Sequence, residues 1–336
     1  MKTSGYLKWM IFLSAFLLVS CQTLPPPIEG EAICDAVAAR GHLNILDINV
    51  LFLRKDMDKR FGYIADFAAE NNVDVILLQE IVGGSFFGTE NSAQDLREIL
   101  RKKHGLYYNI STALEFGETN VAWGANVILS RCTIKSAKVE PLPFVERLLK
   151  RNEIETKAIA LNRNVQMARL EIPERGKINV YNTHLCARCD IGGRARQLEA
   201  LLEFVNNLET NMPEDNPSVL GGDFNFDLFD NEGAEKFLWE KIIDNNFIDA
   251  YAEFMITNSS GQETLDTLCE DEDNADKHCT VGVSKLNGHN ARRVDYIYTK
   301  SPASIRAARV VFNTLVNEGE LTVSDHAGVF ISLNLP

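Results

Sequence analysis

The feature that most constrains the fold is an apolar strand that ends in two glycines and a polar pair. Residues 219–225 read VLGGDFN, and glycine lets the backbone turn sharply where the strand stops. Asp223 and Asn225 are two residues apart, so they point to the same side of an extended chain. A carboxylate and an amide at this position can hold a water molecule and a phosphate oxygen. The same residue types are common in ordinary turns, so this stretch alone leaves both interpretations open.

Further polar side chains stand beside apolar stretches elsewhere in the chain. They are Asn49, Glu80, His184 and Asp295, from segments 44–49, 75–80, 180–184 and 293–298, and Asp325 and His326, just before the apolar strand 329–335. Glu80 follows the near-continuous apolar run 73–79, which is typical of a buried strand. A carboxylate buried there needs a partner, and a divalent cation is the simplest one. The alternative is an exposed glutamate that begins a turn.

In their order along the chain, these six segments resemble the endonuclease/exonuclease/phosphatase superfamily of metal-dependent phosphoesterases, from about Leu43 to Leu335. The superfamily includes deoxyribonuclease I-like nucleases, abasic-site endonucleases, neutral sphingomyelinases and inositol polyphosphate 5-phosphatases. The resemblance implies an α+β fold in which two β-sheets pack face to face between outer layers of helices. It also implies a single catalytic domain over residues 42–336.

The resemblance further implies a phosphodiester hydrolase that uses Mg²⁺, with Mn²⁺ or Ca²⁺ as alternatives. Glu80, Asn49 and Asp325 would form the metal site, since hard oxygen ligands suit Mg²⁺. Asp223 would orient and deprotonate the attacking water. Asn225 would hold a non-bridging phosphate oxygen or help to position the metal.

Two histidines complete the implied site. His326 would stabilise the negative charge of the transition state, and Asp295 would orient the His326 ring by accepting its N–H. His184 would contact the phosphate or protonate the leaving group. A lone histidine is more often structural, but the position of His184 at the end of a strand favours a functional role.

Three charged residues match the superfamily only loosely. Arg163 opens the strand 164–172, where some members carry an arginine that contacts the phosphate. Glu115 and Glu118 lie where some relatives place a carboxylate that orients a histidine. The sequence alone aligns neither glutamate with that position.

The first twenty residues resemble an export signal rather than part of the domain. Lys2 and Lys8 precede the apolar run 9–19, which is too short for a usual membrane span. Residues 18–21 read LVSC, which resembles a bacterial lipobox in which Cys21 is lipidated after cleavage. The alternative is an ordinary secretory signal with a chance cysteine.

A lipidated Cys21 would make the protein a membrane-anchored lipoprotein. Gln22 after the cysteine resembles outer-membrane lipoproteins, which would face the periplasm or the exterior. Residues 21–41 would then form the lipidated end and a tether stiffened by three consecutive prolines. The chain would be anchored to the membrane and would not span it.

The chain is acidic, with a formal net charge of −13 over 336 residues. This charge gives no general attraction to polyanions, although local basic patches can still contact phosphates. Two clusters of arginines flank the implied site, namely Arg188, Arg194 and Arg196 after His184, and Arg292 and Arg293 before Asp295. Surface ion pairs are an equally good explanation of both clusters.

Six cysteines follow Cys21, and an even number in an exported protein favours disulfides. Proximity in the sequence favours Cys186–Cys189 and Cys269–Cys279, which leaves Cys34 with Cys132. Half a zinc site is the alternative for Cys186 and Cys189, but no second pair of ligands follows at zinc-site spacing. Connectivity cannot be deduced from the sequence alone.

The shared motifs leave the substrate open. The arginines and the disulfide-prone loops favour a nuclease, and the acidic charge counts against one. The membrane anchor and the pair Phe86 and Phe87, in a loop bounded by glycines, favour a sphingomyelinase-like lipid phosphodiesterase; both rings could instead pack into the core. A catalytically silent binding lipoprotein is a third hypothesis, disfavoured because every matched catalytic position is filled. No obligate protein partner is evident.

Overall fold

The computed structural model describes most of the chain from Cys34 to the C-terminus. The described residues are 34–52, 56–148, 159–210, 217–228, 234–261, 263–265, 268–269, 277–283, 291–300, 304–316, 319 and 321–336, with the backbone alone for 145–148 and 159–160. The predicted signal segment, the lipidation site Cys21 and the prolines of the tether lie outside them. No helix in the described part is both long and apolar enough to cross a membrane.

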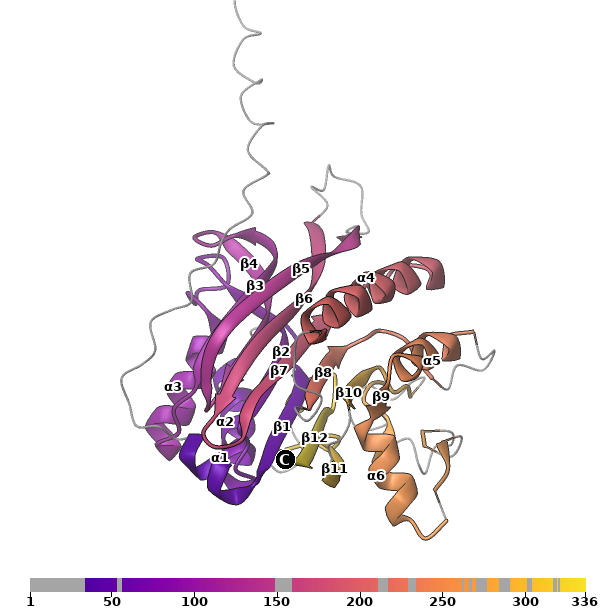
Figure 1. Ribbon diagram of the computed structural model, residues 1–336. Helices are drawn as coiled ribbons and strands as arrows, with labels where there is room; N and C mark the ends of the chain where they lie inside the picture. Colours follow the sequence, from indigo (N-terminus) through magenta and orange to yellow (C-terminus); the bar gives the residue numbers. More distant parts are fainter. Residues whose placement is uncertain are drawn as a thin grey trace, which may run out of the picture.

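Two six-stranded mixed sheets form the centre of the molecule (Figure 1). The first has the order β11-β12-β1-β2-β4-β3, and its strands are β1 (His42–Asn49), β2 (Val75–Gly83), β3 (Asn109–Glu118), β4 (Ala122–Ser130), β11 (Ile305–Val311) and β12 (Gly328–Asn334). The second has the order β5-β6-β7-β8-β10-β9, and its strands are β5 (Thr133–Leu148), β6 (Ile159–Ile172), β7 (Gly176–His184), β8 (Ser218–Asp223), β9 (Phe247–Asp249) and β10 (Asp295–Lys300).

Helices surround the two sheets. In chain order they are α1 (Cys34–Arg40), α2 (Met57–Glu70), α3 (Ser92–His104), α4 (Ile191–Glu209), α5 (Lys236–Asp244) and α6 (Ala250–Asn258). α2 and α3 bury apolar residues such as Phe61 and Leu96 against the first sheet. α4 and α5 bury residues such as Leu198 and Leu238 against the second. The predicted fold, two sheets packed face to face between helical layers, is therefore confirmed.

The layer between the sheets changes from apolar to polar along the strands. In β1, Leu43 and Ile45 pack into the inter-sheet core, and the same face continues with Asp47 and Asn49 because successive side chains alternate across a strand. β2, β7, β8 and β10 show the same change, from Leu77 to Gln79, Val180 to His184, Val219 to Asp223 and Ile297 to Asp295. One end of the layer is thus a hydrophobic core, and the other end is polar and buried.

The folded part includes the last residues of the tether that was predicted over residues 21–41. Helix α1 starts at Cys34, and Cys34 and Val37 are buried. Val37 packs into the inter-sheet core, and Cys34 is disulfide-bonded to Cys132. The proline-rich stretch before α1 gave no periodic apolar signal, so the sequence did not predict this helix.

Three disulfides are present in the described residues. They join Cys34 to Cys132, Cys186 to Cys189 and Cys269 to Cys279. Two of these pairings are the ones that proximity in the sequence favoured, and Cys34–Cys132 is the one that this choice left. Cys186 and Cys189 are therefore joined to each other instead of forming half a zinc site.

The two phenylalanines after β2 have different environments. Phe86 is 78% exposed, whereas Phe87 packs against the core between the first sheet and α2 and α3. The backbone N–H of Phe86 donates to the carbonyl of Val121 at 2.9 Å, and Val121 is itself 54% exposed. Of the two rings, only Phe87 therefore packs into the core, and Phe86 stays exposed.

Candidate active site

Strand pairing brings the predicted site residues to the polar end of the inter-sheet layer. β1 and β2 are parallel and place Asn49 beside Gln79, the residue before Glu80. β7 and β8 are also parallel and place His184 beside Asp223. β10 is antiparallel to β8 and places Asp295 on the other side of Asp223. Asp223 therefore lies at the centre of the group.

Asn49 connects Glu80 of the first sheet with Asp223 of the second. Its Nδ2 donates to Glu80 Oε1 at 3.2 Å and to Asp223 Oδ2 at 3.1 Å. Its Oδ1 accepts from the backbone N–H of Leu51 at 3.1 Å. The other oxygen of Glu80 accepts from the N–H of Phe52 at 3.0 Å. The first turn after β1 therefore fixes both side chains.

Both histidines face Asp223. His326 Nδ1 lies 2.9 Å from Asp295 Oδ2, and His326 Nε2 lies 3.9 Å from Asp223 Oδ2. His184 Nε2 lies 3.4 Å from the same Asp223 oxygen. The predicted pairing of Asp295 with His326 is thus present in the geometry, with one ring nitrogen held by Asp295 and the other directed toward Asp223.

Burial and neighbouring charges set the ionisation of these groups. Burial and the adjacent Asp295 carboxylate raise the pKa of Asp223 to about 7. Burial would lower the pKa of His326, but the charge of Asp295 and its hydrogen bond outweigh burial and raise this pKa to about 10. Burial, together with the positive charges of Arg163 and His326, lowers the pKa of His184 well below its usual value. At neutral pH, His326 is therefore a cation and His184 is neutral.

Two of the site residues adopt a backbone conformation that is unusual for side-chain-bearing residues. Glu80 has φ +60° and Asn225 has φ +51°, both in the left-handed region. The β2–β4 pairing is irregular between Leu78 and Ile81, and such a bulge re-aims the side chain within it. Asn225 Nδ2 donates to the carbonyl of Leu185, and its backbone N–H donates to Asp223 Oδ1. This pattern is typical of functional sites, where local strain is retained.

Asp325 approaches the same site through Ser324. The Ser324 hydroxyl donates to the carbonyl of Asn49 at 2.6 Å and lies 3.3 Å from Asp325 Oδ1. This contact ties the segment before β12 to the end of β1. The Asp325 carboxylate also raises the pKa of His326, after the larger contributions of Asp295 and Asp223.

Arg163 forms a buried ion pair beside His184. Its Nη1 lies 3.1 Å from each carboxylate oxygen of Glu115, and both side chains are 4% exposed. The charge of Arg163 reaches His184, because it contributes to the lowered pKa of that histidine. Of the two loosely matched glutamates, the structure thus places Glu115 at the site, where it pairs with Arg163.

The sequence did not assign a role to a polar network beneath the site. Gln79 Nε2 donates to Asp47 Oδ1 and to Asn182 Oδ1, each at 2.8 Å. Asn182 Nδ2 donates to the carbonyls of Leu78 and Val127 in the opposite sheet. Burial and the nearby Asp295 raise the pKa of Asp47 well above its usual value. Asp47 and Asn49, two positions apart at the end of β1, and Gln79 at the end of the apolar run of β2 were the available signal for this network.

The arginines that flank the site in the sequence differ in their partners and in their exposure to solvent. Arg194 pairs with Glu235, and Arg293 is fully buried against Asp249 Oδ1 at 2.6 Å. These two arginines therefore have structural partners. Arg188 and Arg196 are exposed.

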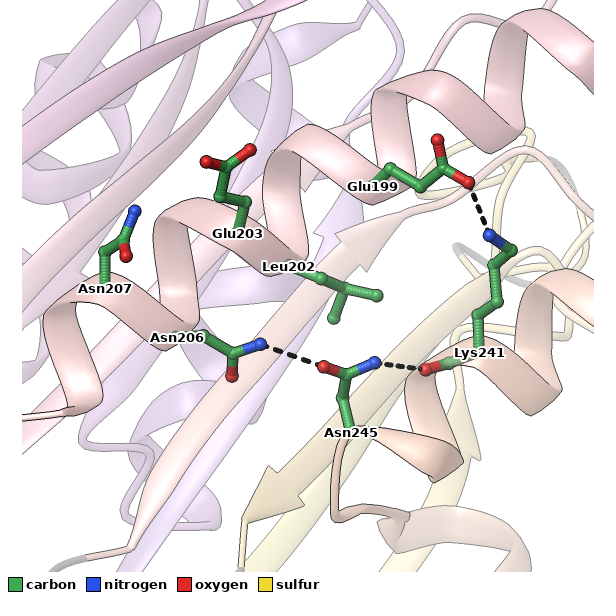
Figure 2. Close-up of a pocket in the computed structure, with 7 residues that line it drawn as sticks. All are labelled: Glu199, Leu202, Glu203, Asn206, Asn207, Lys241 and Asn245. Atoms are coloured by element: carbon green, nitrogen blue, oxygen red, sulfur yellow. Dashed lines mark hydrogen bonds and ion pairs between the residues drawn. The ribbon is translucent and has the colours of Figure 1, made fainter.

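A cavity of about 400 Å³ lies apart from these residues, between α4 and α5 (Figure 2). It is lined by Glu199, Leu202, Glu203, Asn206, Asn207, Lys241 and Asn245. Much of its polar lining is internally paired: Lys241 contacts Glu199 at 2.5 Å and Asn206 donates to Asn245 at 2.9 Å. None of the predicted site residues lines this cavity.

The donor set fits a hard divalent cation on the Glu80 side of Asp223. Asp223, Asp295 and His326 have ligand atoms within 4.8 Å of one another, but Asp295 is engaged by His326, and a cationic histidine is a poor metal ligand. By contrast, the Asn49 amide lies between the carboxylates of Glu80 and Asp223. Two carboxylates that share one neutral donor leave negative charge that a divalent cation would neutralise.

Comparison with known proteins agrees with this architecture. The model of the Endonuclease/Exonuclease/phosphatase family matches residues 48–326, whereas no curated protein sequence matches the chain. An endonuclease/exonuclease/phosphatase from Beutenbergia cavernae has a similar fold, with TM-score 0.60, 19% identity, and coverage of 88% of this chain and 72% of the other.

Two animal proteins are similar at the same level. D. rerio TDP2, solved with a single strand DNA product, superposes with TM-score 0.58 and 17% identity over 87% of this chain and 99% of the other. The human Nocturnin catalytic domain, solved with a bound sulfate anion, gives TM-score 0.58 and 17% identity over 88% and 95%. These superpositions show a shared fold, and the family match spans most of the sequence. The chain therefore belongs to the endonuclease/exonuclease/phosphatase family.

Proposed function

We propose that this protein is a metal-dependent phosphodiesterase that cleaves nucleic acid. The observation that carries the proposal is the arrangement of Asp223 between a protonated His326 and the pair Asn49 and Glu80. It places a group that can accept a proton beside a fixed positive charge and near the Glu80 carboxylate, an oxygen donor suited to Mg²⁺, with Mn²⁺ or Ca²⁺ as alternatives. Phosphodiester hydrolysis needs these three elements together.

Each residue of the chain has a distinct part in this proposal. Asp223, whose pKa is about 7, accepts the proton of the attacking water, since a general base works best when its pKa lies near the working pH. His326 is held protonated by Asp295 and stabilises the charge that develops on the phosphate. Asn225 orients a non-bridging phosphate oxygen. Glu80, Asp325 and the Asn49 Oδ1 would hold a divalent cation, which would supply positive charge to neutralise the phosphate.

The electrostatics of His184 favour one of its two predicted roles. Burial, Arg163 and His326 keep this histidine neutral, so it is a poor source of a proton for the leaving group. A neutral ring can still donate one hydrogen bond to a phosphate oxygen. The positive charge of Arg163 helps to keep His184 neutral. Arg163 is itself held in place by its ion pair with Glu115.

Nucleic acid is favoured as the substrate because two exposed arginines, Arg188 and Arg196, lie in the loop and helix that follow His184. The related fold of D. rerio TDP2 was solved with a single strand DNA product, which supports the same substrate class. The test incubates the oxidised protein with plasmid DNA and RNA, with Mg²⁺ and with EDTA. Cleavage in Mg²⁺ but not in EDTA supports the proposal. Equal cleavage in both conditions contradicts it.

A lipid phosphodiesterase is the second candidate, and the exposed Phe86 favours it. With Val121 beside it, Phe86 presents an apolar tip that could enter a lipid surface. The test measures phosphocholine release from sphingomyelin vesicles by the wild-type protein and by the Phe86→Ser variant. Release that falls in the variant while plasmid DNA stays intact would replace the nuclease proposal. A lack of hydrolysis on every substrate would favour a binding lipoprotein.

A further inference from the structure

The rim of the site beyond His184 is built from three separate elements. They are the bulge in β5, the loop between β7 and α4, and the second turn of α4, and Figure 1 shows α4 running alongside β5 and β6. Gln197 joins all three. Its Oε1 accepts from the backbone N–H of Cys186 at 2.9 Å, and its Nε2 donates to the carbonyl of Pro143 at 3.0 Å. Cys186 is two residues from His184, so their Cα atoms lie at most about 7 Å apart.

The bulge turns an aromatic ring outward at this rim. The β5–β6 pairing is irregular between Pro141 and Val145, and Phe144 within it has φ +69° and is 42% exposed. A bulky residue rarely adopts this conformation, and it persists only where the surrounding structure holds it. Here the Gln197 bond to Pro143 and the burial of Leu142 hold the backbone.

Two arginines stand beside the exposed ring. The Arg196 guanidinium lies 4.2 Å from the centroid of Phe144, which is a cation–π stack. Glu199, the nearest acidic residue along the same helix, pairs with Lys241 instead. Arg188 is exposed within the loop closed by the Cys186–Cys189 disulfide. Among the described residues, no carboxylate pairs with Arg188 or Arg196.

We propose that Phe144, Arg196 and Arg188 form a platform that binds a single nucleic-acid strand beside the catalytic site. A base stacks on the exposed part of the Phe144–Arg196 pair, and Arg188 contacts a phosphate of the same strand. Stacking on an aromatic ring requires an unpaired base, so the platform selects single-stranded substrates. In a chain of net charge −13, two unpaired arginines next to the site give a local attraction that the overall charge lacks. This inference rests on the proposed nuclease function for its role in catalysis, but its binding can be measured without cleavage.

The test measures binding of the full-length oxidised protein in EDTA, which prevents metal-dependent cleavage. The probe is a fluorescent oligothymidylate of about 12 nucleotides, within the usual site sizes of single-strand binders, and anisotropy is recorded over a range of salt concentrations. Phe144→Leu keeps an apolar side chain but removes the ring, and we expect about a 10-fold loss of affinity. Arg188→Gln should reduce the slope of log K against log salt by about 0.7, because Arg188 contacts a phosphate. Arg196→Gln should lower the affinity because the guanidinium is lost from the stack.

Matched controls lie elsewhere on the surface. Phe237→Leu removes an exposed ring from α5, and Arg306→Gln removes an exposed arginine from β11; both should bind like the wild type. If Phe144→Leu does not fold, Arg196→Lys provides a second test, because it keeps the charge but loses the planar stack. Urea midpoints equal to the wild type establish that a variant is folded.

The outcomes separate the platform from the proposed function. Wild-type affinity in all three platform variants, or no binding by the wild type, overturns the platform. A loss of binding to anionic phospholipid vesicles, with oligonucleotide binding unchanged, also overturns it and assigns these residues to a lipid surface. Hydrolysis of bis-p-nitrophenyl phosphate by the wild type with Mg²⁺ tests the catalytic proposal separately. Platform-dependent binding without any hydrolysis would leave the platform standing and remove the proposed function.

Discussion

At the scale of single residues, the site depends on raised pKa values in two neighbouring groups. Asp223 keeps its proton up to about pH 7, because burial and Asp295 disfavour its charge. His326 keeps its proton up to about pH 10, because Asp295 outweighs the effect of burial. A base that can be ionised near pH 7 thus faces a cation that persists well above it, which is the combination that phosphate chemistry requires.

The Asp223 shift predicts how stability depends on pH in the metal-free protein. Between its usual value of 3.8 and its folded value of about 7, Asp223 is ionised in the unfolded chain but protonated in the folded protein. The free energy of unfolding contributed by this group therefore falls as pH rises through that window. Urea midpoints measured in EDTA should fall more between pH 4 and 7 for the wild type than for Asp223→Asn. The difference between the two proteins cancels the contribution of other titrating groups.

The Asp223→Asn comparison has a clear contrary outcome. If the urea midpoints of wild type and variant change in parallel from pH 4 to 7, the carboxyl titrates at its ordinary value and the described burial of the site is wrong. Mg²⁺ provides the companion measurement. A cation that binds only the folded state raises the unfolding free energy by about 2.7 kcal/mol at 100 times its dissociation constant, and this gain should be smaller for Glu80→Gln.

We expect a large loss of stability when Gly222, next to Asp223, is substituted. Its φ is +139°, and a Cβ atom there would lie 2.0 Å from the carbonyl oxygen of Thr183 in β7. Gly222→Ala would force β7 and β8 apart, and we expect a loss of about 3 kcal/mol or more from overpacking and strain together. Gly62→Ala in α2 is the matched control, because no atom lies within 4 Å of the added Cβ. It should stabilise by about 0.5–1 kcal/mol, and both effects are read from urea midpoints.

At the scale of elements, the sequence predicted the strands that end in functional residues better than the elements around them. The runs that became β1, β2, β7, β8 and β10 combine continuous apolar residues with a polar end, and both signals follow from burial between two layers. β5 was not predicted, because Pro141 and Pro143 interrupt its pattern. It tolerates these prolines as the edge strand of its sheet.

Helices without a clear apolar stripe were also not predicted. α1 follows a proline-rich stretch, and α6 begins after β9 where Asp249 Oδ1 accepts from Ala252 at its N-terminus. Contacts between residues far apart in the sequence could not be predicted for a similar reason. Glu115 and Arg163 are 48 residues apart, and no local sequence pattern indicates that they pair.

The disulfides give a prediction at this scale that depends on loop length. Cys34 and Cys132 close a separation of 98 residues, and Cys186 and Cys189 close one of 3. The chain-entropy model gives about 4–5 kcal/mol for the long loop and about 2 kcal/mol for the short one. The two double Cys→Ser variants should therefore differ by about 2–3 kcal/mol in unfolding free energy. Equal losses would show that the links act through native contacts and not through the unfolded chain.

At the scale of the whole molecule, one inter-sheet layer provides both the core and the site. The layer is apolar around Ile45 and Val219 and polar around Asn49 and Asp223, so packing of the first part fixes the spacing of the second. This is why the fold and the gathering of the motif residues could be expected from their order in the sequence. The substrate could not be, because the exposed rings of Phe86 and Phe144 lie on loops and bulges with no shared pattern.

Attachment to a membrane remains a prediction for the complete protein. Residues 18–21 resemble a lipobox that ends at Cys21, which lies outside the described residues. We propose that the mature protein is an outer-membrane lipoprotein with the domain on a short tether. Labelling with a radioactive fatty acid should mark the wild type and not Cys21→Ser, and only the wild type should sediment with the membrane fraction. Membrane-bound Cys21→Ser would contradict the anchor.

The most direct test of the central claim compares metal-dependent DNA cleavage by the wild type, Asp223→Asn and His326→Gln. Asp223 is the expected general base and His326 the expected stabilising cation, so each substitution should slow cleavage by about 10²–10⁴-fold. Both variants should unfold in one cooperative transition, and EDTA should abolish the wild-type activity. Asp223→Asn that cleaves DNA as fast as the wild type in Mg²⁺ would contradict the assignment of this strand end as the active site.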